Sequence, residues 1–150
     1  MKQYKSLIKK NFGSIAGVTL LNILTSFAMV FAGYSLSFLY TAYEYEGDKV
    51  KALIYTFGIV VLIWLFAMFM YYIALLEKSK IQRKLKNELR NMVGKKISSL
   101  SYSEFMGKDS GHYVSWLTND VNEIYSQSFD TLFFGIENLA TAFFSFGALW

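Results

Sequence analysis

The sequence predicts an all-α, polytopic membrane protein whose long membrane helices continue into water. Hydrophobic residues make up 54% of the chain and charged residues only 17%, which is a low share of charge for a soluble domain. Charged residues are absent from 11–43 and from 52–76, and a third apolar run, 131–150, is interrupted only by Glu137. Because about 20 apolar residues cross a bilayer core, each run is long enough to span it.

The N-terminal segment, 1–12, has the pattern of an amphipathic helix that precedes the first crossing at 13–43. An apolar face is surrounded by lysines, a pattern typical of a helix in the membrane interface; the face comprises Tyr4, Leu7, Ile8 and Phe12. A frayed basic tail is the alternative. Gly13 and Gly17 form a small-xxx-small pair that permits close helix packing, and a chance match is the alternative.

Basic residues set the expected orientation. Lys and Arg concentrate in 1–10 and 77–130, and basic segments remain on the cytoplasmic side of a membrane. We therefore expect a multi-pass cell-membrane protein with its N-terminus and the 77–130 loop in the cytoplasm. This topology accounts for the net charge of +4 without a nucleic-acid partner. The chain has no Cys, and its single histidine, His112, has no catalytic constellation around it, so we expect no catalytic, cofactor-binding or metal-binding residue.

The charged segment 77–130 has helical periodicity on both sides of a turn. On the outgoing side, apolar residues recur every three or four positions, so a helix is expected over 52–100; they are Ile81, Leu85, Leu89, Met92, Val93, Ile97 and Leu100. On the return side, 110–150, a coiled-coil-like seam is formed by Val114, Leu117, Val121 and Ile124. The two stripes are expected to cover each other, the alternative being two independent solvated helices.

The turn between these helices, 101–109, predicts a short helix that lies across the end of the hairpin. Ser101 and Glu104 match a capping box, Gly107 is suited to end the helix, and Asp109 or Ser110 is suited to cap the next one. Large apolar side chains at this point favour a docking site for a partner. Packing of the tip onto its own hairpin is the alternative.

The residues of this loop resemble the first intracellular loop of ATP-binding-cassette (ABC) exporters. The similarity runs from Leu100 through Phe105 and then follows a pattern that opens the third membrane helix, namely Gly111, Ser115, Leu117, Asn119, Asp120, Val121 and Ile124. The order of an interfacial helix, two crossings, a long excursion and a third crossing is also similar to that family. The resemblance implies that the chain is the N-terminal part of a permease domain, ending within its third membrane helix.

The resemblance further implies a homo- or heterodimer of permease subunits driven by ATPase domains. The short helix would be a coupling helix that contacts the nucleotide-binding domain, through Tyr102, Glu104, Phe105, Met106 and Lys108. ATP and Mg²⁺ would be bound by that domain, because neither Gly94-Lys95 nor Gly107-Lys108 has the rest of a Walker A motif. The chain itself is therefore not expected to be an enzyme.

Two polar residues lie inside the apolar runs. Asn22 is expected to line a substrate path or bond a neighbouring helix, and Glu137 either faces a cavity or partner or lies near the inner interface. A different function, a membrane anchor or sensor that passes a signal through a helical hairpin, is disfavoured by the third apolar run. The residues do not identify a transported substrate.

Overall fold

The fold is an elongated assembly of helices, as the apolar runs predict. The computed structural model describes residues 2–107 and 109–148, with side chains for 6–103, 105–107, 109 and 111–148. No strand occurs in these ranges, so the prediction of an all-α membrane protein is confirmed. The elements in chain order are α1 (Lys2–Tyr34), α2 (Ser37–Glu44), α3 (Lys49–Ser98), α4 (Tyr102–Met106), α5 (Ser110–Ser115), η1 (Trp116–Asp120), α6 (Val121–Tyr125), η2 (Ser126–Asp130) and α7 (Thr131–Ala148).

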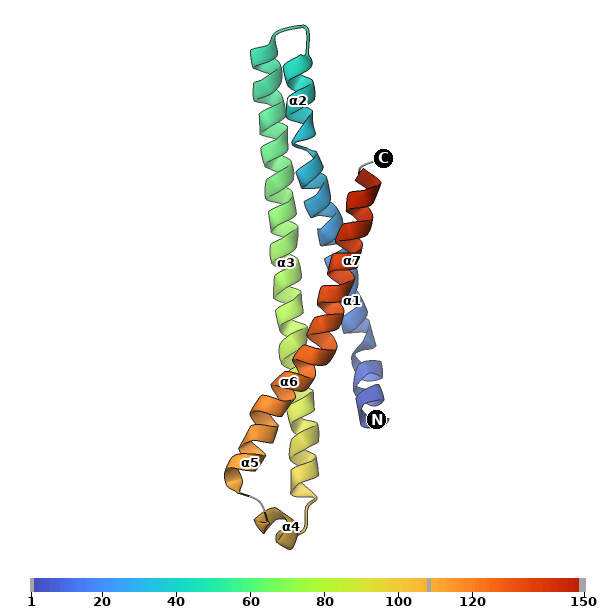
Figure 1. Ribbon diagram of the computed structural model, residues 1–150, viewed down its shortest axis with the longest axis vertical. Helices are drawn as coiled ribbons and strands as arrows, with labels where there is room; N and C mark the ends of the chain where they lie inside the picture. Colours follow the sequence, from blue (N-terminus) through green and yellow to red (C-terminus); the bar gives the residue numbers. More distant parts are fainter. Residues whose placement is uncertain (1, 108, 149–150) are drawn as a thin grey trace.

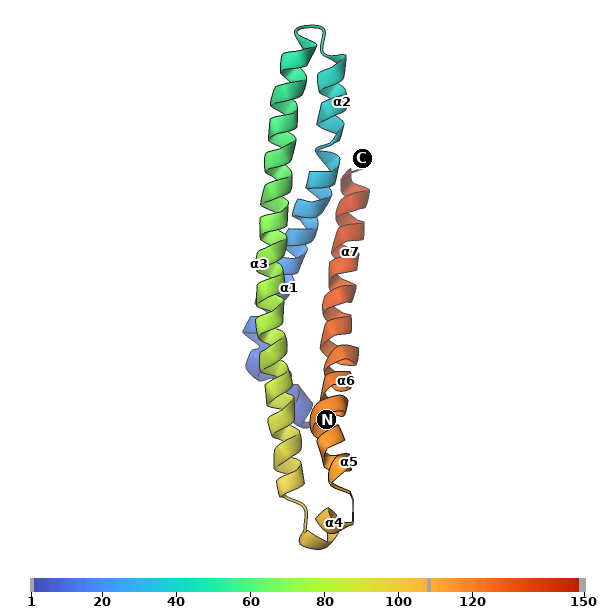
Figure 2. The ribbon, with the colours of Figure 1, turned by 90° about the vertical axis from the view of Figure 1, so that its left-hand side faces the viewer.

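Helix α3 is the longest element of the described chain. It has 50 residues, which at 1.5 Å per residue makes it about 75 Å long. Asp48 caps its first turn by accepting a hydrogen bond from the Lys51 amide at 3.3 Å. Helices α1 and α2 run antiparallel along one part of α3, and the return chain α5–α7 runs beside α3 and then beside α1 (Figures 1 and 2). The short helix α4 closes the end that lies farthest from the α2–α3 loop.

The first apolar run is divided differently from the prediction. Helix α1 continues through residue 12 without a boundary and ends at Tyr34, inside the expected crossing 13–43. The break follows from local chemistry, because the Ser35 hydroxyl donates to the Ala32 carbonyl at 2.6 Å and the Ser37 hydroxyl to the Tyr34 carbonyl at 2.8 Å. Such side-chain bonds compete with the helical ladder, and a nearby glycine makes a break easier.

Two helical stretches among the described residues are long and apolar enough to cross a membrane. They are Ser6–Glu44, which combines α1 and α2, and Lys49–Ser98, which is α3. Helix α7 carries the third apolar run but is not one of the two. The third crossing therefore stays a prediction.

The buried core lies where α1, α3 and the return chain meet. Its members come from all three, namely Leu7, Val18, Ile81, Leu85, Leu89, Val121, Tyr125, Phe129 and Phe133. Met92 and Val93 pack against its edge. The outgoing stripe is thus covered by the return chain, as expected, and α1 covers both from a third side. Leu7 is 4% exposed, so part of the N-terminal amphipathic face lies against protein.

The seam of the return chain is not the one expected. Val114 and Ile124 are exposed, whereas Tyr113, Val121, Tyr125, Phe129 and Phe133 are buried. This four-residue spacing would drift by about 40° per step around a regular α-helix. The π-helical turns η1 and η2 contain one more residue in each hydrogen-bonded loop. They hold the aromatic positions on one face, so the coiled-coil seam predicted from Val114 and Ile124 is wrong.

Candidate functional site

The tip of the hairpin presents apolar side chains to water, as the turn sequence predicts. Helix α4 extends over Tyr102–Met106, within the expected range 101–109. Tyr102 is 78% exposed, Met106 64% and Phe105 44%. Glu104 lies in α4, but its side chain is outside the described set, and Lys108 lies outside the described residues. The Gly107 amide donates to the Ser103 carbonyl at 3.1 Å and marks the end of the helix.

An aromatic cluster on α5 and η1 packs against α4. The rings of Phe105 and Tyr113 are stacked with centroids 4.8 Å apart, and the Tyr113 hydroxyl donates to the Phe105 carbonyl at 3.2 Å. Trp116 contacts both Tyr113 and His112. Phe105 therefore fits both the docking hypothesis and its alternative, because one face of its ring packs on the hairpin while the rest of the side chain is exposed. The spacing of the aromatic residues Tyr113 and Trp116 could have predicted this packing. The predicted seam, which used Val114 and Leu117, did not include them.

The residues of the motif that opens the return chain are distributed over its first three elements, α5, η1 and α6. Val121 is fully buried against α3, and Leu117 accepts a hydrogen bond on its carbonyl from Arg90 Nε at 3.2 Å. Gly111, Asn119 and Ile124 are exposed, whereas Ser115 and Asp120 are half-buried. Asn119 Nδ2 donates to Ser115 Oγ at 3.5 Å, a long contact. The motif therefore includes both the anchor of the return chain and an exposed face beside the tip.

The two polar candidates of the apolar runs lie close to one interface, between α1 and α7. Asn22 is 5% exposed, and its amide nitrogen has no hydrogen-bond partner among the described residues. Ser26, one turn further, donates to the Asn22 carbonyl at 3.0 Å and makes a longer contact with the Glu137 carbonyl at 3.4 Å. Glu137 itself is half-buried. Sequence reasoning missed Ser26, which bridges the two helices as small polar residues do in membranes.

Comparison with known families identifies the chain. The family model of the ABC transporter transmembrane region matches residues 14–150. This chain belongs to the ABC transporter transmembrane family. Comparisons with curated proteins and with solved structures give no match. The resemblance to this family is thereby confirmed, and the chain belongs to the permease domain of a membrane transporter.

A polar clamp joins the N-terminal turns of this ABC permease to the charged half of α3. Asn11 Nδ2 donates to Glu88 Oε2 at 2.9 Å, and Lys10 Nζ lies 3.1 Å from Glu88 Oε1. Burial acts to raise the pKa of Glu88, but the hydrogen bonds from Asn11 and Lys10 and the charges of Lys10 and Lys84 outweigh it, so the pKa is lowered. The carboxylate is therefore held ionised between the two helices. The sequence alone did not predict this site, because its residues are brought together only by the contact between α1 and α3.

Proposed function

We propose that the chain is the permease portion of an ATP-driven exporter, and that α4 transmits movement from a nucleotide-binding domain to the membrane helices. The observation that carries the proposal is the exposed apolar surface of Tyr102, Phe105 and Met106, beyond the end of a helix that is about 75 Å long. Exposed apolar side chains that cluster on a short helix favour a protein contact. Membership of the ABC transmembrane family supports an ATPase domain as the partner.

Contacts between α3 and the return chain make the hairpin that carries α4 rigid. Lys86 Nζ lies 5.0 Å from the centre of the Tyr125 ring, and Lys78 lies 3.9 Å from Asp130. The buried core between α3 and the return chain adds to these contacts. A push on α4 would therefore move both helices together, because packed interiors transmit displacement.

The partners and cofactors of this proposal follow from the same arrangement. The tip and the N-terminus face the cytoplasm of a multi-pass cell-membrane protein, and the α2–α3 loop faces outward, in agreement with the distribution of basic residues. ATP and Mg²⁺ are bound by the nucleotide-binding domain, so this chain performs no hydrolysis. A second permease subunit, identical or different, covers part of the apolar membrane surface.

The test is the Phe105→Ala variant of the complete transporter. An aromatic side chain carries about 200 Å² of surface, and 44% exposure leaves roughly 90 Å² for a partner to cover. At about 25 cal/mol per Å² that area contributes about 2 kcal/mol, or roughly a 30-fold change in the coupling equilibrium. Phe105→Ala should therefore abolish most substrate-stimulated ATPase activity and transport, while expression in the membrane is retained.

Matched variants separate docking from local packing. Tyr113→Phe removes the hydroxyl bond to the Phe105 carbonyl but keeps the stacked ring, and it should retain most activity. Tyr45→Ala, an aromatic residue of similar exposure (59%) at the opposite end of the molecule, should retain full coupling. Equal and mild effects of Phe105→Ala and Lys108→Ala would show that the tip packs only on its own hairpin, and the coupling role would be wrong.

A further inference from the structure

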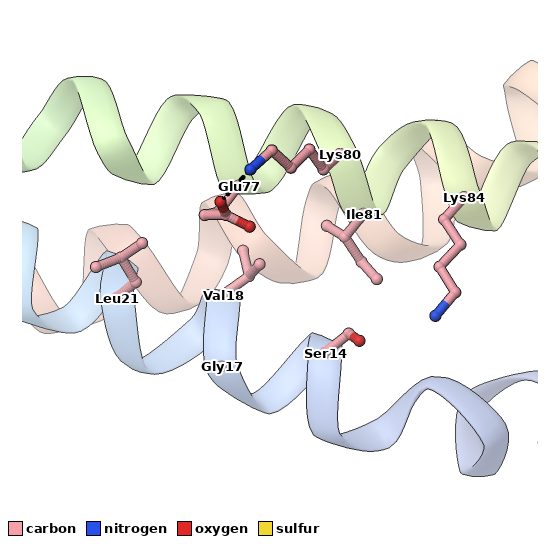
Figure 3. Close-up of a pocket in the computed structure, with 8 residues that line it drawn as sticks. All are labelled: Ser14, Gly17, Val18, Leu21, Glu77, Lys80, Ile81 and Lys84. Carbon is pink, nitrogen blue, oxygen red and sulfur yellow. Dashed lines mark hydrogen bonds and ion pairs between the residues drawn. The ribbon is translucent and has the colours of Figure 1, made fainter.

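A cavity between α1 and α3 lies where the apolar run of α3 changes to charge. It has a volume of about 300 Å³ and is lined by Ser14, Gly17, Val18, Leu21, Glu77, Lys80, Ile81 and Lys84. Figure 3 shows Ile81 and Lys84 directed from α3 toward α1, and Val18 and Leu21 directed toward α3. The lining therefore combines apolar side chains (Val18, Leu21 and Ile81) with polar and charged ones (Ser14, Glu77, Lys80 and Lys84).

The charges around the cavity leave one cation available. Glu77 Oε1 and Lys80 Nζ are 2.6 Å apart and neutralise each other. Lys84 has no ion pair within 4.0 Å among the described residues, although its charge acts on Glu88 one turn further along α3. Figure 3 shows its side chain directed from α3 toward α1, on the side of Ser14. The net charge of the lining is positive, so the cavity favours an anion.

Glycine leaves room for that anion. A Cβ atom built at Gly17 would meet no atom within 4 Å, and the same is true at Gly13. Neither glycine of this small-xxx-small pair is therefore at a close helix contact within the described chain. Gly17 instead forms part of a cavity wall, and the space beside it is wide enough for a headgroup.

We propose that this cavity binds the headgroup of an anionic phospholipid. Lys84 would pair with the phosphate and the Ser14 hydroxyl would donate to it, while the first methylenes of the acyl chains would contact Val18, Leu21 and Ile81. Basic pockets between membrane helices at the membrane boundary are suited to such headgroups. A lipid fits better than free phosphate, because a small anion would leave Val18, Leu21 and Ile81 of the lining uncovered.

The test is lipid binding to the complete transporter in detergent, measured by native mass spectrometry during titration with phosphatidylglycerol or phosphatidylcholine. Lys84→Gln should weaken phosphatidylglycerol binding about fivefold, the effect of one lysine near an anionic surface, and leave phosphatidylcholine binding unchanged. Arg83→Gln, an exposed cation on the adjacent position that does not line the cavity, should have a much smaller effect. Equal losses in the two variants would overturn the proposal, because they would indicate general attraction to the surface.

A second pair of variants tests the cavity itself. Gly17→Leu fills it from the α1 side and should remove the bound phosphatidylglycerol, whereas Gly13→Leu, which has the same open surroundings but lies outside the lining, should retain it. Both replacements favour the helical state, and thermal unfolding checks that the fold is intact. Retention of the lipid by a folded Gly17→Leu variant would overturn the site. Displacement of the lipid by excess inorganic phosphate would also overturn it in favour of a free-anion site.

Discussion

The clamp between α1 and α3 allows a quantitative test, because Glu88 has two partners of very different burial. Asn11 is 1% exposed and its amide donates to Glu88 at 2.9 Å. The side chain of Lys10 is 69% exposed at 3.1 Å from the same carboxylate. A hydrogen bond to a charged group contributes about 1.5–3 kcal/mol, whereas an exposed ion pair contributes about 0–1 kcal/mol. The neutral amide should therefore stabilise the clamp more than the opposite charge does.

Two double-mutant cycles measure this difference. One combines Asn11→Ala with Glu88→Ala and should give a coupling energy of about 2 kcal/mol. The other combines Lys10→Ala with Glu88→Ala and should give less than about 1 kcal/mol. For each cycle, the free energy of unfolding of the wild type, both single variants and the double variant is measured in mixed micelles by tryptophan fluorescence. A larger coupling for Lys10 than for Asn11 would refute the argument from burial.

The same clamp predicts a dependence on pH. The pKa of folded Glu88 lies below its ordinary value of 4.5, so the unfolded chain binds the proton more tightly. The stabilisation is complete above the unfolded pKa and is lost as pH falls through the folded pKa. The stability difference between the wild type and Glu88→Gln should therefore be greatest at neutral pH and disappear in acid. A difference that grows below pH 4.5 would contradict the sign of this shift.

Three further predictions concern the core and the topology. Leu85→Ala removes a side chain that is 0% exposed and should lower the free energy of unfolding by about 2–5 kcal/mol, whereas Leu62→Ala, at an exposed position, should cost less in the same unfolding assay. Tyr125→Phe removes a buried hydroxyl that has no partner among the described residues, so stability should be unchanged or higher, and a loss above about 1 kcal/mol would indicate a missed bond. Cysteine at position 49 should react with an impermeant maleimide from outside the cell and cysteine at position 84 only from inside, and external labelling at 84 would contradict the orientation.

The length and placement of α3 followed from the sequence because desolvation dominates over its apolar half. The absence of charge over 52–76 and the absence of proline predict one continuous helix, and α3 is continuous from Lys49 to Ser98. Its buried stripe, Ile81, Leu85 and Leu89, was also predictable because regular α-helical spacing holds throughout α3. The loop residues from Leu100 through Ile124, together with the order of the apolar runs, indicated the family that the family model confirms.

The features that were not predicted depend on contacts that the spacing of apolar residues does not reveal. The π-helical turns changed the register of the return chain, so a pattern based on regular spacing selected Val114 and Ile124 in place of the aromatic positions. The break after Tyr34 depends on two serine hydroxyls within an otherwise uniform apolar run. The clamp at Glu88 needs α1 to lie against α3, which only the tertiary structure reveals.

The contact between α4 and a nucleotide-binding domain is the central claim, and crosslinking tests it most directly. A photoreactive amino acid at position 106, where Met106 is 64% exposed, should give a crosslinked peptide from the ATPase domain when the complete transporter is irradiated in membranes. The same group at position 45, at the opposite end of the molecule, should give none. The account would be contradicted if position 106 crosslinked only to residues of its own hairpin, or if position 45 and not 106 captured the ATPase domain.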